Sequence, residues 1–527
     1  MLRRLLAFAI AFAWVVGCGG QSSAPVNPPG IAPEGARAGA GMAPDKNVNE
    51  LPEPPVVRSI DGVAKVSLIV NFSGATHFPE FVYNGMNNVA PTIRVDPGDA
   101  IVLDVTNDLP PGPGDKFDVN IHFHGIGSSP NAPGDDVLGT LARSGQKLHY
   151  VVHIPKNQEP GLYWYHPHVH GETAYQVGSG GMSGAIIVNG LEHHLPGLAK
   201  MRERVIIVRA IGIGTLARRD GDETMADGGD MSGMSEERVR PQAINSEPCG
   251  SDLGLLTTLN GAYHPVITIA PGEKQFFRVI NATAHKTLKL DYGGEMELIA
   301  IDGFALDTWP GNPPTKLVKT IVMPPAARAE FVVTGRPSGF GTFQTLCFDS
   351  GLTGDHDPQL ALARLRWPGR PDYRPAFVGR LTVGAPLPQN VYTTKLPPIA
   401  AKRTAIFTEG PTHFFINGRM FTMSEPPLFV VHVGTVEEWH IVNKTREVHD
   451  FHIHQIHFLV KEINGVKLLH PYWADSQLIP HRQKDGSPGT LLLIMNFRDP
   501  VIKGTFVFHC HILDHEDLGM MAKMQAI

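Results

Sequence analysis

The sequence predicts an all-β protein built from three domains of related structure. Gly (56 residues) and Pro (45 residues) are abundant among the 527 residues, and both favour turns between short strands over helix interiors. Similar segments recur about every 170 residues, which indicates repeated copies of one domain. No long stretch has the spacing of apolar residues that is typical of an amphipathic helix.

Each repeated segment contains an Asn-Gly pair, an alternating strand, a glycine turn and a second alternating strand that ends at Asn. Asn-Gly is typical of a tight hairpin turn, and alternation with a period of two places apolar side chains on one strand face. The repeats begin at Asn84-Gly85, Asn260-Gly261 and Asn417-Gly418, and their strand pairs occupy 92–108, 266–283 and 428–445. They predict β-sandwich domains over residues 56–195, 196–375 and 376–527.

Composition limits the kind of function. Hydrophobic residues make up 42% of the chain and charged residues 18%, which is enough apolar material for a packed core. The net charge is −6 and no basic stripe is present, so we expect no nucleic-acid partner. The 25 histidines are unusual, because imidazole is the most common metal ligand among side chains.

The first 18 residues predict a signal peptide. Arg3 and Arg4 precede an apolar run that is shorter than the roughly 20 residues of a membrane span. The run ends in Val15-Val16-Gly17-Cys18, which resembles the lipobox of bacterial lipoproteins and implies cleavage and acylation at Cys18. An ordinary secretory signal is the alternative. The sequence does not decide between the general secretory route and the twin-arginine route. We expect an exported protein that is lipid-anchored to a bacterial membrane, in the periplasm or at the cell surface.

Residues 19–55 are rich in Gly, Ala, Pro and Ser and predict a flexible tether. Export implies an oxidising compartment, so Cys249 and Cys347 are predicted to form a disulfide. Two buried free thiols are the alternative.

Four histidine pairs carry the chemistry. They are His122/His124, His166/His168, His452/His454 and His509/His511. Residues i and i+2 of a strand point the same way, so each pair places two imidazoles on one face. Two pairs fall in the first predicted domain and two in the last, and together they could line a cavity between these domains.

A second site follows from the odd offsets. Cys510 lies between two paired histidines, and His449 lies three residues before His452, so both point away from the pairs. They can meet His515, with Met520 as a weak axial ligand. Two His, one Cys and one Met form the ligand set of a blue copper electron-transfer centre. Zinc is less favoured because the set contains a thioether and a single thiolate.

These motifs, in this order, resemble those of the multicopper oxidases, the family of laccases, ascorbate oxidase and bacterial copper-efflux oxidases. The resemblance runs from about residue 56 to the end of the chain. It implies three cupredoxin-like Greek-key β-sandwich domains and four copper ions. It also implies oxidation of a donor at a type 1 copper and reduction of O2 to water at a trinuclear cluster. An electron could pass from Cys510 to the cluster through the neighbouring His509 or His511.

The resemblance also implies each ligand. The type 1 copper takes His449, Cys510, His515 and Met520; the type 2 copper takes His122 and His452; one type 3 copper takes His124, His166 and His511, and the other takes His168, His454 and His509. Every ligand position is filled, which argues against relatives that have lost copper. One departure is Asp450, which stands where the family usually has Pro. His170 and His457 extend two clusters, and we expect neither to bind metal.

Reduction of O2 consumes protons, so carboxylates near the cluster have a chemical purpose. The resemblance points to Asp135 and Glu516. The sequence does not separate them from Asp136, Asp514 or Asp517.

The donor is less constrained. A phenol or an aromatic amine, as for laccases, is the leading expectation, and Cu(I) is the alternative. Residues 219–237 contain Met225, Met231 and Met234 among many acids, which suits Cu(I), although a solvated loop is favoured. Met420 and Met423 are predicted to be strand core.

Two other classes remain as weaker alternatives. A non-catalytic copper-binding protein would be expected to have an incomplete ligand set, and a copper nitrite reductase normally has two domains per chain and builds its site between subunits. The ligand set closes within one chain, so we expect a monomer.

Overall fold

The structure is a computed structural model that describes residues 49–74, 77–112, 117–212, 255–355, 357–369 and 373–527. The expected signal peptide with Cys18, most of the expected tether, Cys249 and the Met-containing segment 219–237 lie outside the described residues.

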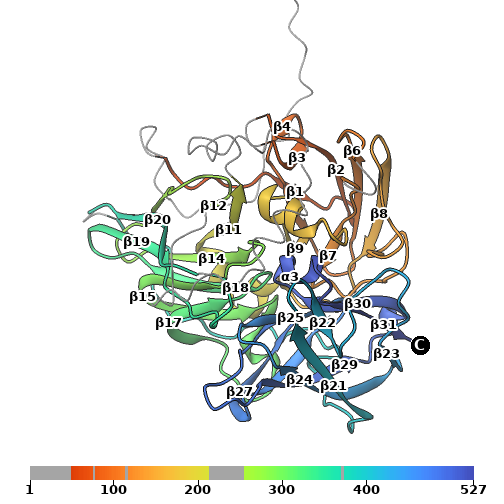
Figure 1. Cartoon of the computed structure of the whole chain (residues 1–527). Coiled ribbons are helices and arrows are strands. Elements are labelled where there is room, and N and C mark those ends of the chain that lie inside the picture. The colour runs from red at the N-terminus through yellow and green to blue at the C-terminus, as the bar shows by residue number, and fades with distance from the viewer. Residues whose placement is uncertain (1–48, 75–76, 113–116, 213–254, 356, 370–372) are drawn as a thin grey trace, which may run out of the picture. The chain divides into compact units, whose positions relative to one another are not determined.

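The strands form three groups along the chain, which confirms the predicted all-β fold (Figure 1). Two five-stranded sheets make up the first group. In spatial order one sheet contains β4 (Met86–Asn87), β3 (Pro79–Tyr83), β2 (Val63–Phe72), β6 (Ala100–Asn107) and β8 (Lys147–His153). The other contains β1 (Val56–Arg58), β5 (Thr92–Val95), β10 (Gly184–Val188), β9 (Gly161–His166) and β7 (His122–His124).

The second group forms one ten-stranded sheet. Its main path runs through β12 (Leu255–Leu259), β11 (Arg202–Gly212), β14 (Lys274–Asn281), β18 (Arg328–Thr334), β15 (Leu288–Ile301), β19 (Gly339–Thr345), β20 (Leu360–Trp367) and β13 (Val266–Thr268). β16 (Phe304–Ala305) and β17 (Lys316–Met323) both pair with β15.

The third group again has two sheets. One contains β22 (Phe414–Ile416), β21 (Ala401–Glu409), β24 (Thr435–Asn443), β29 (Gly489–Phe497), β26 (Phe458–Ile463) and β27 (Val466–Ala474). The other contains β23 (Phe429–Val431), β31 (Met521–Ala526), β30 (Gly504–Cys510), β25 (His449–Ile453) and β28 (Ser476–Ile479).

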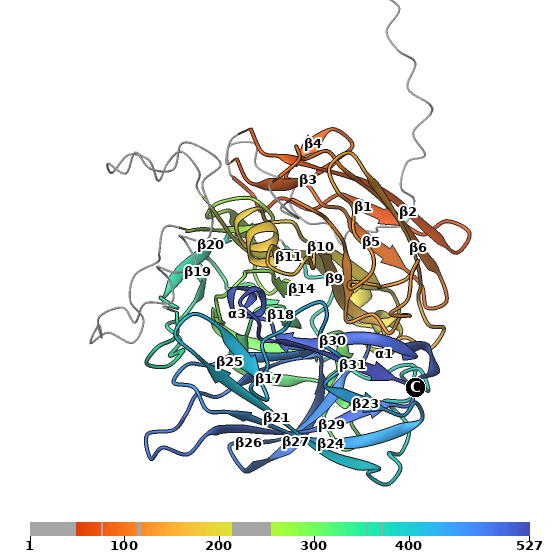
Figure 2. The ribbon, with the colours of Figure 1, turned by 45° about the vertical axis from the view of Figure 1, so that its right-hand side comes forward.

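Helices are short. Those in the described residues are η1 (Ala174–Ser179), α1 (Leu191–His194), η2 (Leu198–Lys200), η4 (Leu306–Thr308), η5 (Pro500–Ile502) and α3 (Leu513–Asp517). None of the helices in the described part has the length and apolar character needed to cross a membrane. Figures 1 and 2 place β9 and α3 where the three groups of strands meet.

The three repeats share one local geometry. The Asn residues of the Asn-Gly pairs, Asn84, Asn260 and Asn417, have φ of 49°, 51° and 52°, and the glycine after each is also left-handed. This is the backbone of the hairpin turn that the Asn-Gly pairs predicted. In each group an earlier strand, which precedes the hairpin in the chain, also pairs in parallel with a strand that follows the hairpin: β2 with β6, β11 with β14, and β21 with β24.

Each group of strands encloses its own apolar core, which includes Leu103, Phe331 and Trp439 respectively, all fully buried. A fourth cluster joins the groups, because it contains Trp164 from β9 and Leu513 from α3. This shared packing fixes the histidine-bearing strands against one another.

The expected tether ends earlier than predicted. Glu50 pairs with Val266 as a parallel bridge, and Leu51 is 3% exposed within the core of the second group. The short apolar side chain of Leu51 therefore belongs to the folded body, although its Pro-rich surroundings hid it in the sequence. Cys347 is disulfide-bonded; its predicted partner, Cys249, lies outside the described residues.

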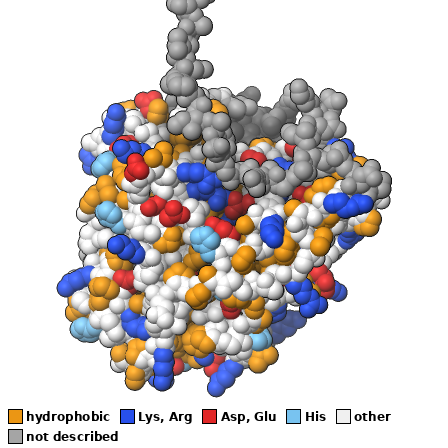
Figure 3. Space-filling model, turned by 180° about the vertical axis from the view of Figure 1, so that it is seen from behind, with side chains coloured by type: hydrophobic (Ala, Val, Ile, Leu, Met, Phe, Trp, Pro, Cys, Tyr) orange, Lys and Arg blue, Asp and Glu red, His pale blue; other side chains and the backbone are white. Residues whose placement is uncertain are grey.

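Charges are mixed on the face of the molecule seen in Figure 3. Lys and Arg alternate there with Asp and Glu among apolar side chains. This face therefore carries no continuous basic stripe of the kind that binds a nucleic-acid backbone.

Candidate metal centre

Four strands from the two ends of the chain bring the histidine pairs together. In the first domain β7 pairs with β9, with His122 opposite His166. In the third domain β25 pairs with β30, with His452 opposite His509. All eight paired histidines are buried, so the imidazoles line an enclosed site between the two domains.

Three imidazole nitrogens converge on one point. His168 Nε2 lies 3.2 Å from His509 Nε2 and 3.2 Å from His454 Nε2, and the last two atoms are 3.3 Å apart. Two nitrogens bound tetrahedrally to one ion, each about 2.0 Å from it, lie about 3.3 Å apart. The three side chains therefore have the spacing of ligands to a single ion.

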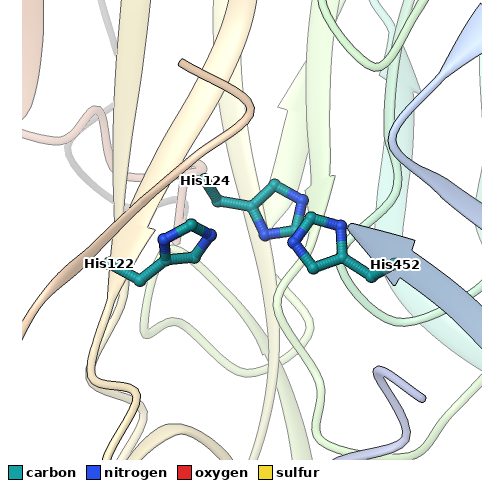
Figure 4. A group of neighbouring side chains, drawn as sticks. All are labelled: His122, His124 and His452. Atoms are coloured by element: carbon teal, nitrogen blue, oxygen red, sulfur yellow. The ribbon is translucent and has the colours of Figure 1, made fainter. Parts of the chain in front are cut away.

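Two further groups of histidines lie close by. His122, His124 and His452 place one ring nitrogen each within 4.8 Å of the others, and Figure 4 shows their rings turned toward one another. His124, His166 and His511 form another such group within the same limit. His124 belongs to both, so the groups are parts of one cluster.

Several ring nitrogens of the cluster have no partner within the described residues. Buried ring nitrogens without a hydrogen-bond partner in the described residues are His122 Nε2, His124 Nδ1, His166 Nε2, His452 Nε2, His454 Nδ1 and both nitrogens of His511. Three of these rings are oriented through their other nitrogen: that of His122 by Asp135, that of His166 by the Pro167 carbonyl and that of His452 by the Asp475 carbonyl. Such contacts fix the ring and leave the inner nitrogen for a metal.

Burial keeps these imidazoles neutral. Burial, with repulsion from neighbouring histidines, holds the pKa of His166, His452, His454 and His511 well below the usual value. Burial also lowers the pKa of His168 to about 3. Neutral imidazole is the form that binds metal, so the cluster is ready for an ion at neutral pH.

A second site forms around Cys510. Its Sγ lies 3.7 Å from His449 Nδ1 and 3.7 Å from His515 Nδ1, and the two nitrogens are 3.0 Å apart. Thr445 Oγ1 contacts His449 Nε2 at 3.0 Å and so helps fix that ring. One sulfur and two nitrogens thus face a common centre, as in trigonal copper–thiolate sites.

Met520 is fully buried beside this site, and its carbonyl accepts a hydrogen bond from the Cys510 amide at 3.0 Å. Burial raises the pKa of the Cys510 thiol well above its usual value. Metal binding would therefore displace the thiol proton. Asp450 is fully buried here, and burial raises its pKa well above the usual range.

The chain itself joins the two sites. Cys510 belongs to the second site, while its covalent neighbours His509 and His511 belong to the histidine cluster.

The structure separates the candidate carboxylates. Asp135 Oδ2 lies 2.9 Å from His122 Nδ1, and Glu516 Oε2 lies 3.0 Å from His509 Nδ1. Asp136 accepts the Gly139 amide at 2.8 Å, and Asp514 lies 3.8 Å from His285. Asp517 accepts the backbone amides of Gly171 and Ala174 and so anchors the start of η1. Of these five acids, Asp135 and Glu516 are those placed against cluster histidines.

Sequence reasoning missed Asp475. This buried residue of the third domain places Oδ1 3.1 Å from His124 Nε2, and Arg328 of the second domain forms an ion pair with it. No local motif marks either residue, because they meet the cluster only through tertiary packing. His457 is also buried, and its Nε2 lies 3.1 Å from Asp475 Oδ2. His170 packs edge-on against Phe421 at 4.8 Å between ring centres.

A small pocket lies beside His515. Its lining includes His285, Thr287, Asp355, Glu447 and His515. Glu447 Oε1 lies 3.7 Å from His515 Nε2. Burial and the nearby acids Glu409 and Asp355 raise the pKa of Glu447 well above its usual value. His515 is 7% exposed and His449 is fully buried, so His515 is the ligand of this site closer to solvent.

The prediction that Met420 and Met423 are strand core is wrong. Both lie in the loop after β22, and their side chains are 38% and 52% exposed. Met420 packs against Gly519, the residue before Met520. The Asn417-Gly418 turn ends strand pairing here, so the apolar methionines follow a loop across the surface.

The comparisons agree with this donor set. A family model described as "Multicopper oxidase" matches residues 68–193, and a second model with that description matches residues 394–526. These ranges contain the first and last pairs of histidine motifs.

The chain is 25% identical over 401 residues to a laccase of Bacillus subtilis (strain 168), covering 71% of this chain and 72% of the relative. It is 24% identical over 451 residues to the multicopper oxidase mco of Staphylococcus aureus, covering 84% and 83%. A solved multicopper oxidase from Campylobacter jejuni, described as a metallo-oxidase, has a TM-score of 0.66 at 20% identity, covering 92% of this chain and 99% of that one. The last likeness shows the cupredoxin-based fold. With two family models on the histidine-bearing domains and buried nitrogens spaced for metal, the chain belongs to the multicopper oxidases and is a copper-containing oxidoreductase.

Proposed function

We propose that this chain binds four copper ions and couples the one-electron oxidation of a donor to the four-electron reduction of O2 to water. Type 1 copper is assigned to His449, Cys510, His515 and Met520; type 2 copper to His122 and His452; and the type 3 pair to His124, His166 and His511 on one side and His168, His454 and His509 on the other. The observation that carries the proposal is the convergence of His168, His454 and His509 at 3.2–3.3 Å beside the Cys510 site.

When bound, copper supplies one-electron redox chemistry at the Cys510 site and the electrons for O2 reduction at the histidine cluster. The chain contributes three things. Cys510 and its neighbours His509 and His511 provide a covalent route between the sites. Burial excludes water from the cluster. Asp135 Oδ2 lies 2.9 Å from His122 Nδ1 and Glu516 Oε2 lies 3.0 Å from His509 Nδ1, so both acids are placed to hold or deliver protons near the oxygen site.

The donor is proposed to be a phenol or an aromatic amine that transfers its electron through His515. Asp355 and Glu447 line the pocket beside His515, and the negative charge of this lining comes mainly from Asp355 because burial raises the pKa of Glu447. Acids attract a cation and stabilise the positive charge that an aromatic donor acquires as it loses an electron.

Oxidation of Cu(I) is a second candidate, and the same acidic pocket favours it. A cation gains more from carboxylates than a neutral ring does. The exposed Met420 and Met423 lie on the loop that contacts Gly519, and thioethers suit Cu(I). The S. aureus and C. jejuni relatives are named as a multicopper oxidase and a metallo-oxidase, which is compatible with either donor.

We also propose that the protein is exported, anchored through a lipid on Cys18 in the periplasm or at the cell surface, and monomeric. The lipobox-like residues 15–18 and the ligand set contained in one chain support this. A Cys18→Ala variant that still incorporated radiolabelled palmitate during expression would contradict the anchor. Sedimentation of the protein without its lipid anchor tests the oligomeric state, and a monomer is expected.

The first experiment measures copper content and O2 consumption of the copper-loaded protein with a phenol, an aromatic amine and Cu(I). Four copper ions per chain and donor-dependent O2 consumption are expected. Fewer ions with no consumption would overturn the proposal. Removal of residues 219–237 separates the donors: loss of the Cu(I) reaction alone would identify a cuprous oxidase, and unchanged turnover would favour the aromatic donor.

A further inference from the structure

A polar pocket, distinct from the one beside His515, borders residues that contact the acids of the cluster. It is formed by the segment before β9, the segment around Asn390 and the third domain. Its lining includes Gln158, Glu159, Asn390, Gln455, His457 and Asp499. Asp499 is half-buried, whereas Glu159, Gln455 and His457 are buried, so the pocket runs inward from the surface.

The inner wall of this pocket touches both carboxylates that hold the cluster histidines of β7. Gln455 Nε2 donates to Asp135 Oδ2 at 2.7 Å, and Asp135 Oδ2 lies 2.9 Å from His122 Nδ1. His457 Nε2 lies 3.1 Å from Asp475 Oδ2, and Asp475 Oδ1 lies 3.1 Å from His124 Nε2. Two short chains of contacts therefore connect the pocket with the cluster.

Glu159 is a buried carboxyl of this pocket, and its two oxygens have different surroundings. Its Oε1 accepts a hydrogen bond from Asn390 Nδ2 at 2.8 Å, and its Oε2 has no hydrogen-bond partner in the described residues. Gln455 Oε1 is likewise buried without a partner there. Two acceptors lining one polar pocket suit bound water, which needs two to four polar contacts.

Burial raises the pKa of Glu159 to about 7, although the Asn390 hydrogen bond opposes the shift. The titratable groups that surround it are Tyr163, whose hydroxyl donates to the Glu159 carbonyl; His194 and Asp307, which form an ion pair with each other; and Tyr392, His457 and Asp499 in the pocket. A carboxyl with this pKa can both release and regain a proton near neutral pH.

We propose that Glu159 is the proton-uptake residue of the oxygen-reducing site, taking protons from solvent through this pocket and passing them past Gln455 toward Asp135. The inference rests on the proposed function, since it supplies the protons that O2 reduction consumes. In each transfer the O–H bond at Glu159 Oε2 breaks and an O–H bond forms on pocket water, while another O–H bond of that water breaks as a proton moves on past Gln455. Solvent returns a proton to Glu159, and no electron moves.

The test compares the full-length, copper-loaded wild type with Glu159→Gln and Glu159→Asp. Each protein is reduced anaerobically and mixed with O2 between pH 5 and pH 9, and reoxidation is followed by the return of the blue absorption of the Cys510 site. Glu80→Gln is the matched control, because Glu80 is also buried with a raised pKa but does not line the pocket. We expect the reoxidation rate of the wild type to fall as pH rises through about 7. Glu159→Gln should be about tenfold slower at pH 7 and should lack this fall in rate.

Glu159→Asp should restore part of the rate, whereas anaerobic reduction by the donor and the control should match wild type. Reoxidation of Glu159→Gln at the wild-type rate with the wild-type pH profile would overturn the proposal. A wild type that takes up no copper would instead contradict the proposed function.

A second readout needs no copper. Infrared titration of the copper-free protein with carboxyl-labelled Glu should show a buried carboxylic acid that ionises near pH 7 and is missing in Glu159→Gln. Absence of that signal in the wild type would also overturn the proposal, even if the Gln variant failed to fold.

Discussion

Arg328 of the second domain forms a bidentate ion pair with Asp475 of the third. Its Nη1 donates to Oδ1 at 2.5 Å and its Nη2 donates to Oδ2 at 2.6 Å. Both side chains are fully shielded from solvent. Asp475 in turn contacts His124 with its carboxylate and His452 with its carbonyl. A domain that supplies no predicted copper ligand thus fixes the position of two cluster histidines.

Arg328→Met should destabilise the copper-free protein by about 3–5 kcal/mol, because it leaves the Asp475 carboxylate buried without its partner. Urea unfolding measures this loss. Arg403→Met is the control: Arg403 pairs with Glu437 but is partly exposed, so we expect about 1 kcal/mol or less. The double variant Arg328→Met/Asp475→Leu removes the unpaired carboxylate and should be more stable than Arg328→Met. Equal stability of the two variants would mean that the unpaired Asp475 charge does not cause the loss.

Cys510→Ser should abolish the blue absorption and donor-driven O2 consumption, because serine does not replace the thiolate that the two Nδ1 atoms face. The histidine cluster is untouched, so three copper ions per chain should remain. Metal analysis and electron paramagnetic resonance check the count. Loss of all copper would mean that the two sites do not fill independently.

Asp135→Asn should slow reoxidation of the reduced enzyme by about a hundredfold while donor oxidation under anaerobic conditions stays normal. The amide keeps a contact to His122 but cannot pass on a proton. Asp136→Asn is the matched control, since that acid binds the Gly139 amide instead. Equal effects of the two substitutions would argue against a specific role for Asp135.

Asp355→Asn should raise KM for Cu(I) about tenfold and leave KM for a neutral phenol nearly unchanged, whereas Glu447→Gln should have a smaller effect because burial raises the pKa of Glu447. The cause is the loss of the Asp355 charge from the pocket beside His515. Glu438→Gln, an acid of β24 that pairs with Lys402, provides the control. The idea fails if both donors respond alike, and high salt should weaken Cu(I) binding in the same direction.

Glu159 should make stability depend on pH. Its folded pKa of about 7 is above the usual 4.5, so the folded state holds the proton more tightly than the unfolded state does. This stabilisation is complete below about pH 4.5 and is lost as pH rises to about 7, amounting to about 3 kcal/mol. Between pH 5 and pH 8 the wild type should therefore lose stability relative to Glu159→Gln. Parallel pH profiles for the two proteins would contradict this.

The repeats and the histidine motifs were readable because they are local. Asn-Gly turns and alternating strands specify hairpins within a few residues, and an i, i+2 pair such as His122/His124 shares a strand face whatever surrounds it. The sequence also separated His449 and Cys510 from the pairs by their offsets.

The remaining parts depend on distant contacts. Asp475 meets Arg328 only because the second and third domains dock, and Glu159 is a buried acid whose partner Asn390 lies 231 residues away in the chain. Neither has a spacing signature. The prediction for Met420 and Met423 was wrong because it relied on local apolar composition. That composition suggested a strand, whereas the turn at Asn417-Gly418 leads into an exposed loop.

The convergence of His168 and His454 has a consequence for how the protein matures. These residues are 286 positions apart, yet their Nε2 atoms lie 3.2 Å from each other. Because the chain is synthesised from its N-terminus, His168 is made long before His454 and His509. All three ligands are therefore in place for an ion only after the third domain has docked. Release of the ion is then coupled to separation of the first and third domains. The stability of the folded protein therefore increases with the concentration of free copper. Under copper starvation the same chain would be easier to open and degrade.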